Sequence, residues 1–456
     1  MKKLNLILLS LVSLCITGSG QGVFDDPREG LWLGTMKVSE QMSLRLGFEI
    51  SQVEDGAYVA KMNVIEQKAL DIPMDTCIFS GDSLYIEFKG AGIIYLGTFS
   101  GEEDRILGTY SQGGGSFTLD MIRVDEWPLE VERPQTPVRP FPYDEVEVKF
   151  ENSEAGIILA GTLTKPREGN NLPAVVLISG TGRNDRDETS MGHFLLLSDF
   201  LTRNGFAVLR YDKRGVGASG GDYAQATTFD FAEDAWTALK YLRAQPFVNP
   251  DLTGLIGHSE GALIAPIVAS EHVNAVAFIV MMGGIGIPGS ELLLSQSENL
   301  ARINGVPEEE ITEIKEKNRA LYAIAGSGLE DSLMDVKCIE AVPDLDESML
   351  NTLKWVWFRT FLSLDPASYL SKVSCPVLAI TGEKDVQCSP EENLAAIEAS
   401  LKRAGNRNYL IKVMPGLNHL FQTAESGSPY EYEQIPEIIS PDALDFILDW
   451  LHGVNP

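Results

Sequence analysis

Hydrophobic and polar residues alternate along the first part of the chain. Between residues 23 and 125, alternating runs at 44–50, 84–88, 95–99 and 117–121 are separated by Gly or Ser clusters. Because successive side chains of a strand point to opposite faces, this period predicts a small all-β domain, either a sandwich or a barrel. The region carries no cluster of catalytic residue types, so we interpret it as a packing or spacer domain. The alternative is a ligand- or partner-binding module.

The pattern changes after a proline-rich segment at 126–142, which predicts a stiff linker. From residue 143 to residue 456, nearly continuous apolar runs alternate with amphipathic stretches such as 231–242. Apolar runs of this kind are typical of strands buried on both faces. They lie at 174–178, 207–209, 255–256, 275–280 and 376–380. The sequence therefore predicts an α/β domain whose mostly parallel sheet is covered by helices on both faces.

A helical stretch interrupts this alternation at about 285–370. Its clearest helical patterns cover 308–323 and 350–364. This is more chain than one strand-to-strand connection needs. We therefore interpret it as a cap inserted over a functional site of the α/β domain, from which it would exclude water. Its aromatic residues either line an acyl pocket or form the core between cap and sheet; they are Trp355, Trp357, Phe358 and Phe361.

The N-terminus resembles a targeting segment. Two lysines follow Met1, residues 4–16 form an apolar run, and residues 18–20 are small. This order predicts a secretory signal peptide at 1–20 and export to the periplasm or the medium. An uncleaved anchor and a lipoprotein formed at Cys15 are the alternatives. No membrane span is expected once the segment is removed.

The net charge and the cysteine content limit the classes of partner and cofactor that the protein is expected to bind. Lys and Arg number 36 against 65 Asp and Glu, so the net charge is −29. Such an acidic surface repels phosphate backbones, and nucleic acid is excluded as a partner. Cys77, Cys338, Cys375 and Cys388 are too few for a disulfide framework, and no CxxC or HExxH spacing supports a metal site. The cysteine content and motif spacing therefore give no support to a metal site, and the sequence does not indicate the oligomeric state.

The first chemical signal is the run Gly257-His258-Ser259-Glu260-Gly261, between an apolar strand and a helical stretch. The pattern G-x-S-x-G in this context predicts a sharp turn that lifts the Ser259 hydroxyl above the edge of the sheet. A helix N-terminus at that point favours developing negative charge. Ser259 is the predicted nucleophile.

A serine nucleophile needs a base and an acid that orients the base. His419 lies on a loop after the strand-like run 409–413, and we predict that it is the base; His193 is the alternative. Asp385 follows the strand 376–380 and is the predicted acid, with Glu383 as the alternative. The resulting chain order of serine, acid and histidine is that of the α/β-hydrolases.

Two backbone N–H groups are expected to bind the oxyanion. One belongs to Glu260, the residue after the nucleophile. The other is assigned to Thr181, in the small-residue loop Ser179-Gly180-Thr181-Gly182 after the first apolar strand. Removing a donor of this kind typically lowers turnover about 10²–10³-fold.

Residues from about 145 to 456 resemble the α/β-hydrolase superfamily, and most closely bacterial serine esterases of the EstD-like branch, which is similar to the prolyl-peptidase branches. The runs that carry the likeness are 179–188, 210–219, the serine turn, 382–385 and 416–419. The all-β domain also resembles a module found ahead of such hydrolases. The resemblance implies hydrolysis of short-chain acyl esters with no metal and no organic cofactor. It implies a structural pair between Asp212 and Arg214 as well. It also suggests that Arg183, Asp185 and Asp187 either frame the acyl site or form salt bridges.

Together these signals predict an exported serine hydrolase that cleaves short-chain carboxylic esters of a small-molecule acyl substrate through an acyl-enzyme. A peptidase or amidase, and an acyl thioesterase, would use the same residues and remain alternatives. A non-catalytic binding protein on a hydrolase scaffold is the alternative of another class. The acyl chain length and the leaving group are left open.

Overall fold

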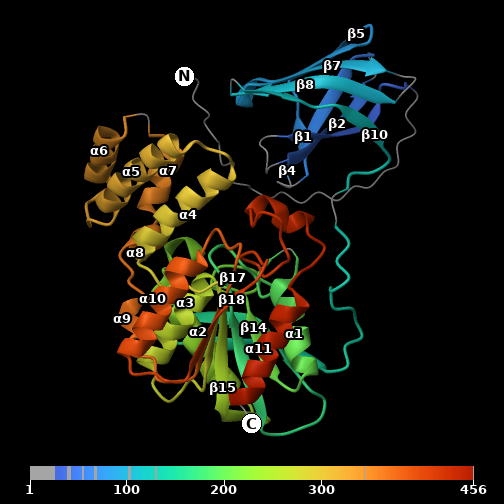
Figure 1. Cartoon of the computed structure of the whole chain (residues 1–456). Coiled ribbons are helices and arrows are strands. Elements are labelled where there is room, and N and C mark those ends of the chain that lie inside the picture. The colour runs from blue at the N-terminus through green and yellow to red at the C-terminus, as the bar shows by residue number, and fades with distance from the viewer. Residues whose placement is uncertain are drawn as a thin grey trace. The chain divides into compact units, whose positions relative to one another are not determined.

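The computed structural model describes residues 26–454 except 38–42, 54–55, 66–68, 101–103, 114, 129–130, 190 and 344. The predicted signal peptide at 1–20 lies outside the described residues. The chain divides into two compact units, Met1–Glu132 and Arg133–Pro456 (Figure 1), and the division falls within the segment predicted as a linker. None of the described helices has both the length and the apolar character needed to cross a membrane.

The first unit is built from antiparallel strands. They are β1 (Gly30–Lys37), β2 (Ser43–Gln52), β3 (Tyr58–Val64), β4 (Ala69–Pro73), β5 (Thr76–Ser80), β6 (Ser83–Phe88), β7 (Ile93–Ser100), β8 (Arg105–Gln112), β9 (Gly115–Thr118) and β10 (Met121–Val124), with a 3₁₀ turn at Lys89–Ala91. Their order is β4-β3-β2-β1-β10-β8-β7-β6-β5, and β9 pairs with β8. Contacts between β3 and β5 bring the two ends of this order together around a single core, in which Trp32, Phe48 and Tyr95 are fully buried.

The predicted run 117–121 is not one strand. β9 ends at Thr118 and β10 begins at Met121. Between them, the buried Leu119 turns inward: its N–H donates to the carbonyl of Gly108, and its own carbonyl accepts the Tyr95 hydroxyl at 3.0 Å. The alternating pattern continued through this turn because Leu119 is buried like a strand residue.

The second unit contains a mixed sheet of eight strands. They are β11 (Asp144–Asn152), β12 (Ile157–Lys165), β13 (Leu172–Ile178), β14 (Ala207–Tyr211), β15 (Val248–His258), β16 (Ile279–Met282), β17 (Val377–Gly382) and β18 (Tyr409–Met414). Their order is β11-β12-β14-β13-β15-β16-β17-β18. The pairs from β14 through β18 are parallel, while β11 and β12 are antiparallel additions. The predicted strand 275–280 is only partly a strand, because residues 272–278 return from a helix to the sheet before β16 begins.

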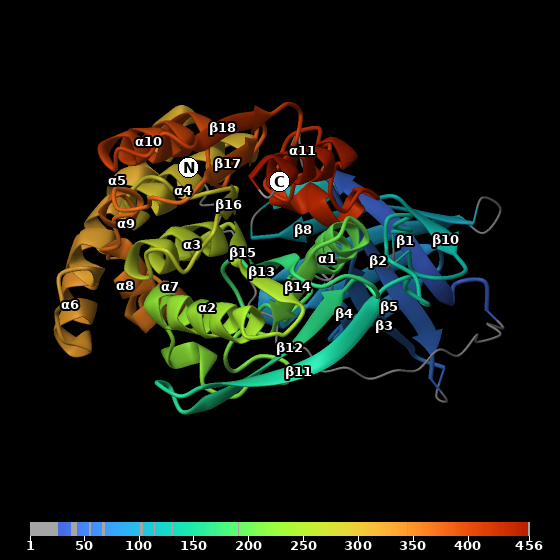
Figure 2. The ribbon, with the colours of Figure 1, turned by 90° about the horizontal axis from the view of Figure 1, so that it is seen from below.

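Helices cover both faces of this sheet, as predicted (Figure 2). One face is covered by α2 (Thr228–Arg243), α3 (Glu260–Glu271) and α10 (Pro390–Arg403), and the other by α1 (His193–Arg203) and α11 (Pro441–Val454). A capping box at Thr227 and Asp230 satisfies the first N–H groups of α2 and fixes where that helix begins. The predicted fold class, an α/β-hydrolase sheet preceded by a small all-β unit, is confirmed.

Six helices are inserted between β16 and β17. They are α4 (Gly289–Ile303), α5 (Glu308–Ala325), α6 (Asp331–Ala341), α7 (Glu347–Lys354), α8 (Val356–Leu362) and α9 (Ala367–Leu370). The predicted helix 350–364 is split at Trp355, whose backbone is extended and whose indole N–H donates to the carbonyl of Ala224 at 3.1 Å. This hydrogen bond joins the insertion to the 3₁₀ turn Tyr223–Gln225. A further 3₁₀ segment of the second unit, Pro429–Gln434, precedes α11.

Candidate active site

Ser259 sits at the turn between β15 and α3 in a strained conformation. Its φ is 54° and its ψ is −118°, a region that L-residues rarely adopt. Its N–H donates to the carbonyl of Met282 at 2.9 Å, which anchors the turn to the neighbouring strand. A Cβ on Gly257 would collide with the carbonyl of Gly261, and a Cβ on Gly261 would collide with that of Ile178. The two glycines are therefore needed for the turn that presents the hydroxyl.

Asp385 and His419 form a buried pair. The Nδ1 atom of His419 lies 2.7 Å from Asp385 Oδ2. The other carboxylate oxygen accepts the N–H groups of Gln387 at 2.9 Å and Cys388 at 2.7 Å. Asp385 is thereby fixed from both sides, and His419 presents its remaining nitrogen, Nε2, to the outside of the pair.

Both Ser259 and His419 line one cavity of about 330 Å³. Among the described residues, no hydrogen-bond partner is recorded for Ser259 Oγ or for His419 Nε2, so both reactive atoms are free to meet a ligand or each other. Catalytic hydrogen bonds often close only when substrate is bound. About half of the other lining residues are apolar, among them Leu292, Trp357 and Phe361 from the inserted helices.

The loop after β13 brings backbone donors to the same cavity. The N–H of Gly180 is already used, because it donates to Glu188 Oε1 at 2.7 Å. Within the described residues, the N–H groups of Thr181 and Glu260 have no recorded partner. A Cβ on Gly180 would come within 3.0 Å of the Ser259 Cβ, which shows how closely this loop approaches the nucleophile.

The side chain of Glu260 carries a contact set that the sequence analysis missed. It is fully buried and accepts from Thr228 Oγ1 at 2.8 Å, Trp357 Nε1 at 2.6 Å and Lys213 Nζ at 3.1 Å. Lys213 Nζ also donates to the carbonyl of Gly180 at 2.5 Å. The residue after the nucleophile is thus tied to the Gly180 loop and to an inserted helix. The sequence carried no signal for these contacts, because Lys213, Thr228 and Trp357 lie 47, 32 and 97 positions from Glu260.

The two alternative residues are engaged elsewhere. His193 is fully buried, and both its ring nitrogens lie at hydrogen-bond distance from other groups, Glu188 at 2.9 Å and the Leu420 carbonyl at 3.1 Å. Glu383 Oε2 accepts the N–H of Gly416 at 2.8 Å. Neither alternative lines the cavity that contains Ser259.

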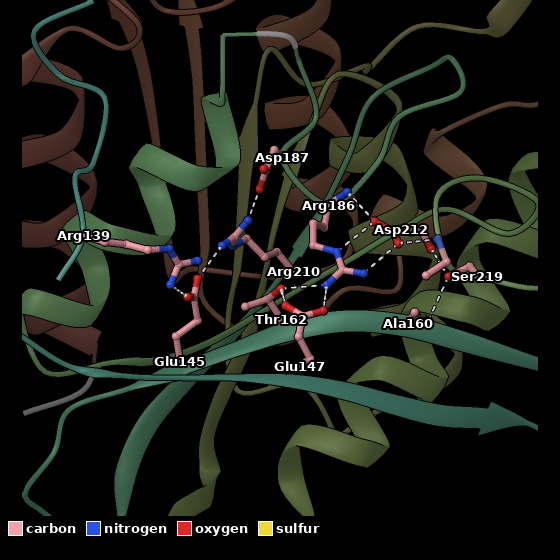
Figure 3. A network of polar contacts seen from close by, with 11 residues as sticks. Arg139, Glu145, Glu147, Ala160, Thr162, Arg186, Asp187, Arg210, Asp212 and Ser219 are labelled. Carbon is pink, nitrogen blue, oxygen red and sulfur yellow. Dashed lines mark hydrogen bonds and ion pairs between the residues drawn. The ribbon is translucent and has the colours of Figure 1, made fainter. Parts of the chain in front are cut away.

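The implied pair between Asp212 and Arg214 is wrong. Asp212 accepts Arg186 Nε at 3.0 Å and Arg186 Nη2 at 2.8 Å (Figure 3), because the loop after β13 folds back over the end of β14. Arg214 turns instead toward α2 and donates to Asp234 at 2.6 Å and to Asp230 at 2.9 Å.

Arg183, Asp185 and Asp187 do not line the cavity with Ser259. Asp187 pairs with Arg210 (Figure 3), and Arg183 donates to the carbonyl of Gly215 at 2.9 Å. Of the two interpretations of this trio, the structure supports contacts that hold the loop, and the cavity is lined by other loop residues, among them Asn184 and Glu188.

Among the described residues, two groups of side chains could offer ligand atoms to a metal ion, namely Glu188 with His193 and His258, and Asp385 with Cys388 and His419. In each group an imidazole nitrogen lies 2.7–2.9 Å from a carboxylate oxygen. Ligands around a tetrahedral zinc with bonds of about 2.0–2.1 Å lie about 3.3 Å apart. The observed spacing is that of direct hydrogen bonds, so it fits protons better than a metal ion.

The eight-stranded sheet, the strained serine at its elbow and the buried acid–histidine pair define an α/β-hydrolase. A model of the family described as serine aminopeptidase, S33, matches residues 172–425, more than half of the chain. The chain therefore belongs to that family.

Curated relatives carry related names. Esterase EstD of Thermotoga maritima is 29% identical over 299 residues, which cover 64% of this chain and 65% of EstD. An acyl transferase of Photobacterium leiognathi is 31% identical over 150 residues, 32% of this chain and 46% of the transferase. The chain thus spans just under two thirds of the first relative and about half of the second.

Solved structures with this fold include Est1E from Butyrivibrio proteoclasticus with bound ferulic acid. It is 19% identical, with a TM-score of 0.42, and the match covers 67% of this chain and 96% of Est1E. A Pyrococcus furiosus esterase is also 19% identical, with a TM-score of 0.40 and coverage of 63% and 90%.

Proposed function

We propose that this protein is an exported serine hydrolase that cleaves carboxylic esters with Ser259, His419 and Asp385. The observation that carries the proposal is the convergence of a serine with a strained backbone and a buried Asp–His pair on one small cavity. That arrangement is costly to build and has a direct chemical use, since it activates a nucleophile.

The chemistry follows from the contacts. His419 Nε2 takes the proton of Ser259 Oγ as that oxygen attacks the acyl carbon, and Asp385 stabilises the imidazolium through Nδ1. The carbonyl oxygen gains negative charge and is held by the N–H groups of Thr181 and Glu260, at the N-terminus of α3. His419 then protonates the leaving alcohol. Water repeats the sequence on the acyl-enzyme and releases the acid.

The cavity favours small, neutral acyl groups. Its volume of about 330 Å³ lies at the lower end of the range of roughly 300–1,000 Å³ typical of small-molecule sites. Leu292, Trp357 and Phe361 supply apolar contact area on the side of the inserted helices, which would act as a cap. Short-chain esters are therefore the substrates we expect to be cleaved best.

An aminopeptidase, as the family description suggests, is the second candidate. Such an enzyme needs a free carboxylate to anchor the amino group of its substrate. Among the described residues that line the cavity, Glu188 is the only acidic one, and its oxygens are already engaged by two imidazoles and the Gly180 N–H. This favours an ester over an aminoacyl amide. An acyl transferase would use the same acyl-enzyme with an acceptor other than water.

Export rests on the sequence alone. The two lysines, the apolar run and the small residues within 1–20 form a signal-peptide pattern. N-terminal sequencing of the protein recovered from a bacterial periplasm or medium would locate the cleavage site, and finding the intact N-terminus inside the cell would contradict export.

The central test compares the parent with Ser259→Ala on acetyl, butyryl and longer chromogenic esters, with aminoacyl amides and acyl thioesters in parallel. Loss of the nucleophile should lower kcat by about 10⁶-fold. A fluorophosphonate probe should label the parent and leave the variant unlabelled. Equal ester hydrolysis by the two proteins would sink the assignment, and a preference for the amides or thioesters would move it to the corresponding alternative.

A further inference from the structure

A buried cluster of three titratable side chains lies directly behind the proposed catalytic residues. Glu188, His193 and His258 come from the loop after β13, the start of α1 and the end of β15, and all three are at most 6% exposed. Glu188 Oε1 lies 2.8 Å from His258 Nδ1, and Oε2 lies 2.9 Å from His193 Nδ1. None of the three takes part in the proposed chemistry.

The cluster joins the three segments that the chemistry uses. Glu188 Oε1 also accepts the N–H of Gly180, beside the proposed oxyanion donor of Thr181, at 2.7 Å. His258 Nε2 lies 3.0 Å from the carbonyl of His419, the proposed base. The carbonyl of Leu420, the next residue, lies 3.1 Å from His193 Nε2. One carboxylate is thereby linked to the oxyanion loop, the nucleophile turn and the loop of the base.

The protons in this cluster can be counted from its partners. A carbonyl oxygen only accepts hydrogen bonds, so Nε2 of His258 and of His193 must each carry a proton. Each Nδ1 then faces a carboxylate oxygen, and each of these contacts needs a further proton. Two imidazoles that are protonated only at Nε2 and one ionised carboxylate have no proton for either contact. The fully bonded cluster therefore holds two extra protons and a net charge of +1.

The environment decides which proton binds first. Burial acts to lower the pKa of His258, but the charge and hydrogen bond of Glu188 outweigh it and raise that pKa above its ordinary value. Burial dominates at His193 and lowers its pKa. For Glu188, burial acts to raise the pKa, and the two imidazoles hold it below its ordinary value. The first extra proton is therefore assigned to His258, which forms an ion pair with Glu188, and the contact between Glu188 and His193 gains its proton only at lower pH.

Resting on the proposed function, we propose that Glu188 is a positioning residue that holds the oxyanion loop and the base loop in register with Ser259 through His258 and His193. The charged link to His258 carries most of this effect, because it joins the nucleophile turn to the carbonyl of the base itself. Misplacing a catalytic group by about 1 Å costs on the order of 10²-fold in rate.

Glu188→Gln tests the proposal with little change in shape. An amide oxygen still accepts from Gly180, and the amide N–H₂ donates to a neutral His193. The amide cannot stabilise the imidazolium of His258. We expect kcat to fall about 10- to 100-fold with KM changed less than about 3-fold, because glutamine keeps the shape of the part of the cavity wall that Glu188 lines. Fluorophosphonate titration of active sites keeps misfolded protein out of the kcat values.

The pH profile separates positioning from a general structural role. The groups that face His258 are Glu188, His193, His419 and Asp385. As pH rises through its raised pKa, His258 loses its proton and the link to Glu188 fails, so the parent should show an alkaline fall in kcat that Glu188→Gln lacks. Side-chain ¹⁵N NMR across a pH series should show that His258 stays doubly protonated to a higher pH in the parent than in the variant.

Asp234→Asn is the matched control, because Asp234 is an equally buried carboxylate that pairs with Arg214 and does not line the cavity. Asp234→Asn should lower thermal stability while keeping the fall in kcat at alkaline pH that the parent shows. A Glu188→Gln enzyme with parental kcat and an unchanged alkaline limb would overturn the positioning role. So would a stoichiometric metal ion in the parent that is lost in this variant. Full activity of Ser259→Ala would instead overturn the proposed function, so the two failures are distinguishable.

Discussion

The loop between β13 and α1 sends neighbouring side chains to two different places. Asn184 and Glu188 line the cavity with Ser259, whereas Arg186 and Asp187 line a separate hollow of about 530 Å³ beside β11 and β14. On the first side Glu188 meets two histidines; on the second, Arg186 meets Asp212 (Figure 3). Two charge clusters only a few residues apart therefore have different roles, one beside the chemistry and one anchoring the loop.

This contrast shows that charge density in a motif does not by itself locate a site. Five of the six residues in the run 183–188 are charged. Four of these do not line the cavity with Ser259, namely Arg183, Asp185, Arg186 and Asp187. What distinguishes the two sides is the partner set. Arginine paired with aspartate stays charged at every physiological pH, whereas imidazoles paired with a carboxylate can gain or lose protons near neutrality.

The largest expected effect comes from breaking the cavity side at Asp385. Asp385→Asn keeps the shape but removes the charge that orients His419 and stabilises its protonated form, so kcat should fall about 10⁴-fold. Steady-state ester hydrolysis with active-site titration measures this. A loss of less than 10-fold would show that His419 does not depend on this partner.

A substitution in the Arg186–Asp212 pair should lower the free energy of unfolding rather than the rate of hydrolysis. Asp212→Asn leaves the half-buried guanidinium of Arg186 without its main partner; removing one member of a fully buried pair costs about 3–5 kcal/mol, and the partial exposure of Arg186 places the expected loss at or below the lower end of that range. Chemical denaturation should show a lower free energy of unfolding, while kcat/KM of the folded variant stays within a few-fold of the parent. A rate loss as large as that of Asp385→Asn would abolish the contrast between the two sides.

Gly283→Ala tests how tightly the base is packed. Gly283 has a φ of +59°, and a Cβ there would lie 3.1 Å from His419 Cε1. Displacing the imidazole should lower kcat about 10²-fold. Gly305→Ala is the control, since Gly305 has a φ of +76° and open space around it, so it carries the same backbone penalty without the contact. Equal rate losses in the two variants would rule out a steric effect on His419.

The smallest effect is a difference in pH dependence. Burial acts to raise the pKa of Asp212, but the Arg186 hydrogen bonds outweigh it and lower the pKa, so this pair stabilises the fold above about pH 4 and loses its contribution as pH falls through the lowered value. The raised pKa of His258 has the opposite sign: its contribution is full below about pH 6.5 and is lost as pH rises through the raised value.

Unfolding measurements from pH 5 to 9 on the parent, Asp212→Asn and Glu188→Gln would show whether the two contributions to stability depend on pH as expected. The destabilisation caused by Asp212→Asn should be constant over this range, and that caused by Glu188→Gln should shrink toward the alkaline end. Parallel curves for all three proteins would contradict the assignment of the near-neutral titration to the Glu188 cluster.

The sequence was sufficient where a function depends on a local element. Ser259 was found from the glycines on either side of it, and Asp385 and His419 from their places after apolar strands. The structure brings Asp385 and His419 together and places His419 and Ser259 on the same cavity, while their catalytic roles stay predictions. The mostly parallel sheet likewise followed from continuous apolar runs, because burial on both faces leaves a strong pattern, whereas the order of its strands was not predicted.

Contacts between distant segments left no such pattern. Glu188 and His258 are 70 positions apart, and nothing in either local sequence indicates the other. The same is true of Trp357 and Glu260, 97 positions apart. Helix breaks such as that at Trp355 were also missed, since an extended residue held by one indole hydrogen bond does not disturb the helical period.

The unusual backbone of Ser259 has a consequence for engineering this protein. A residue held in such a region costs the folded state about 1–3 kcal/mol, and glycine at the same place would largely avoid that cost. A variant library screened by heat alone is therefore expected to enrich chains that have exchanged the serine for glycine. Thermal selection has to be coupled to a turnover screen, or it will return robust proteins that have lost their reactivity.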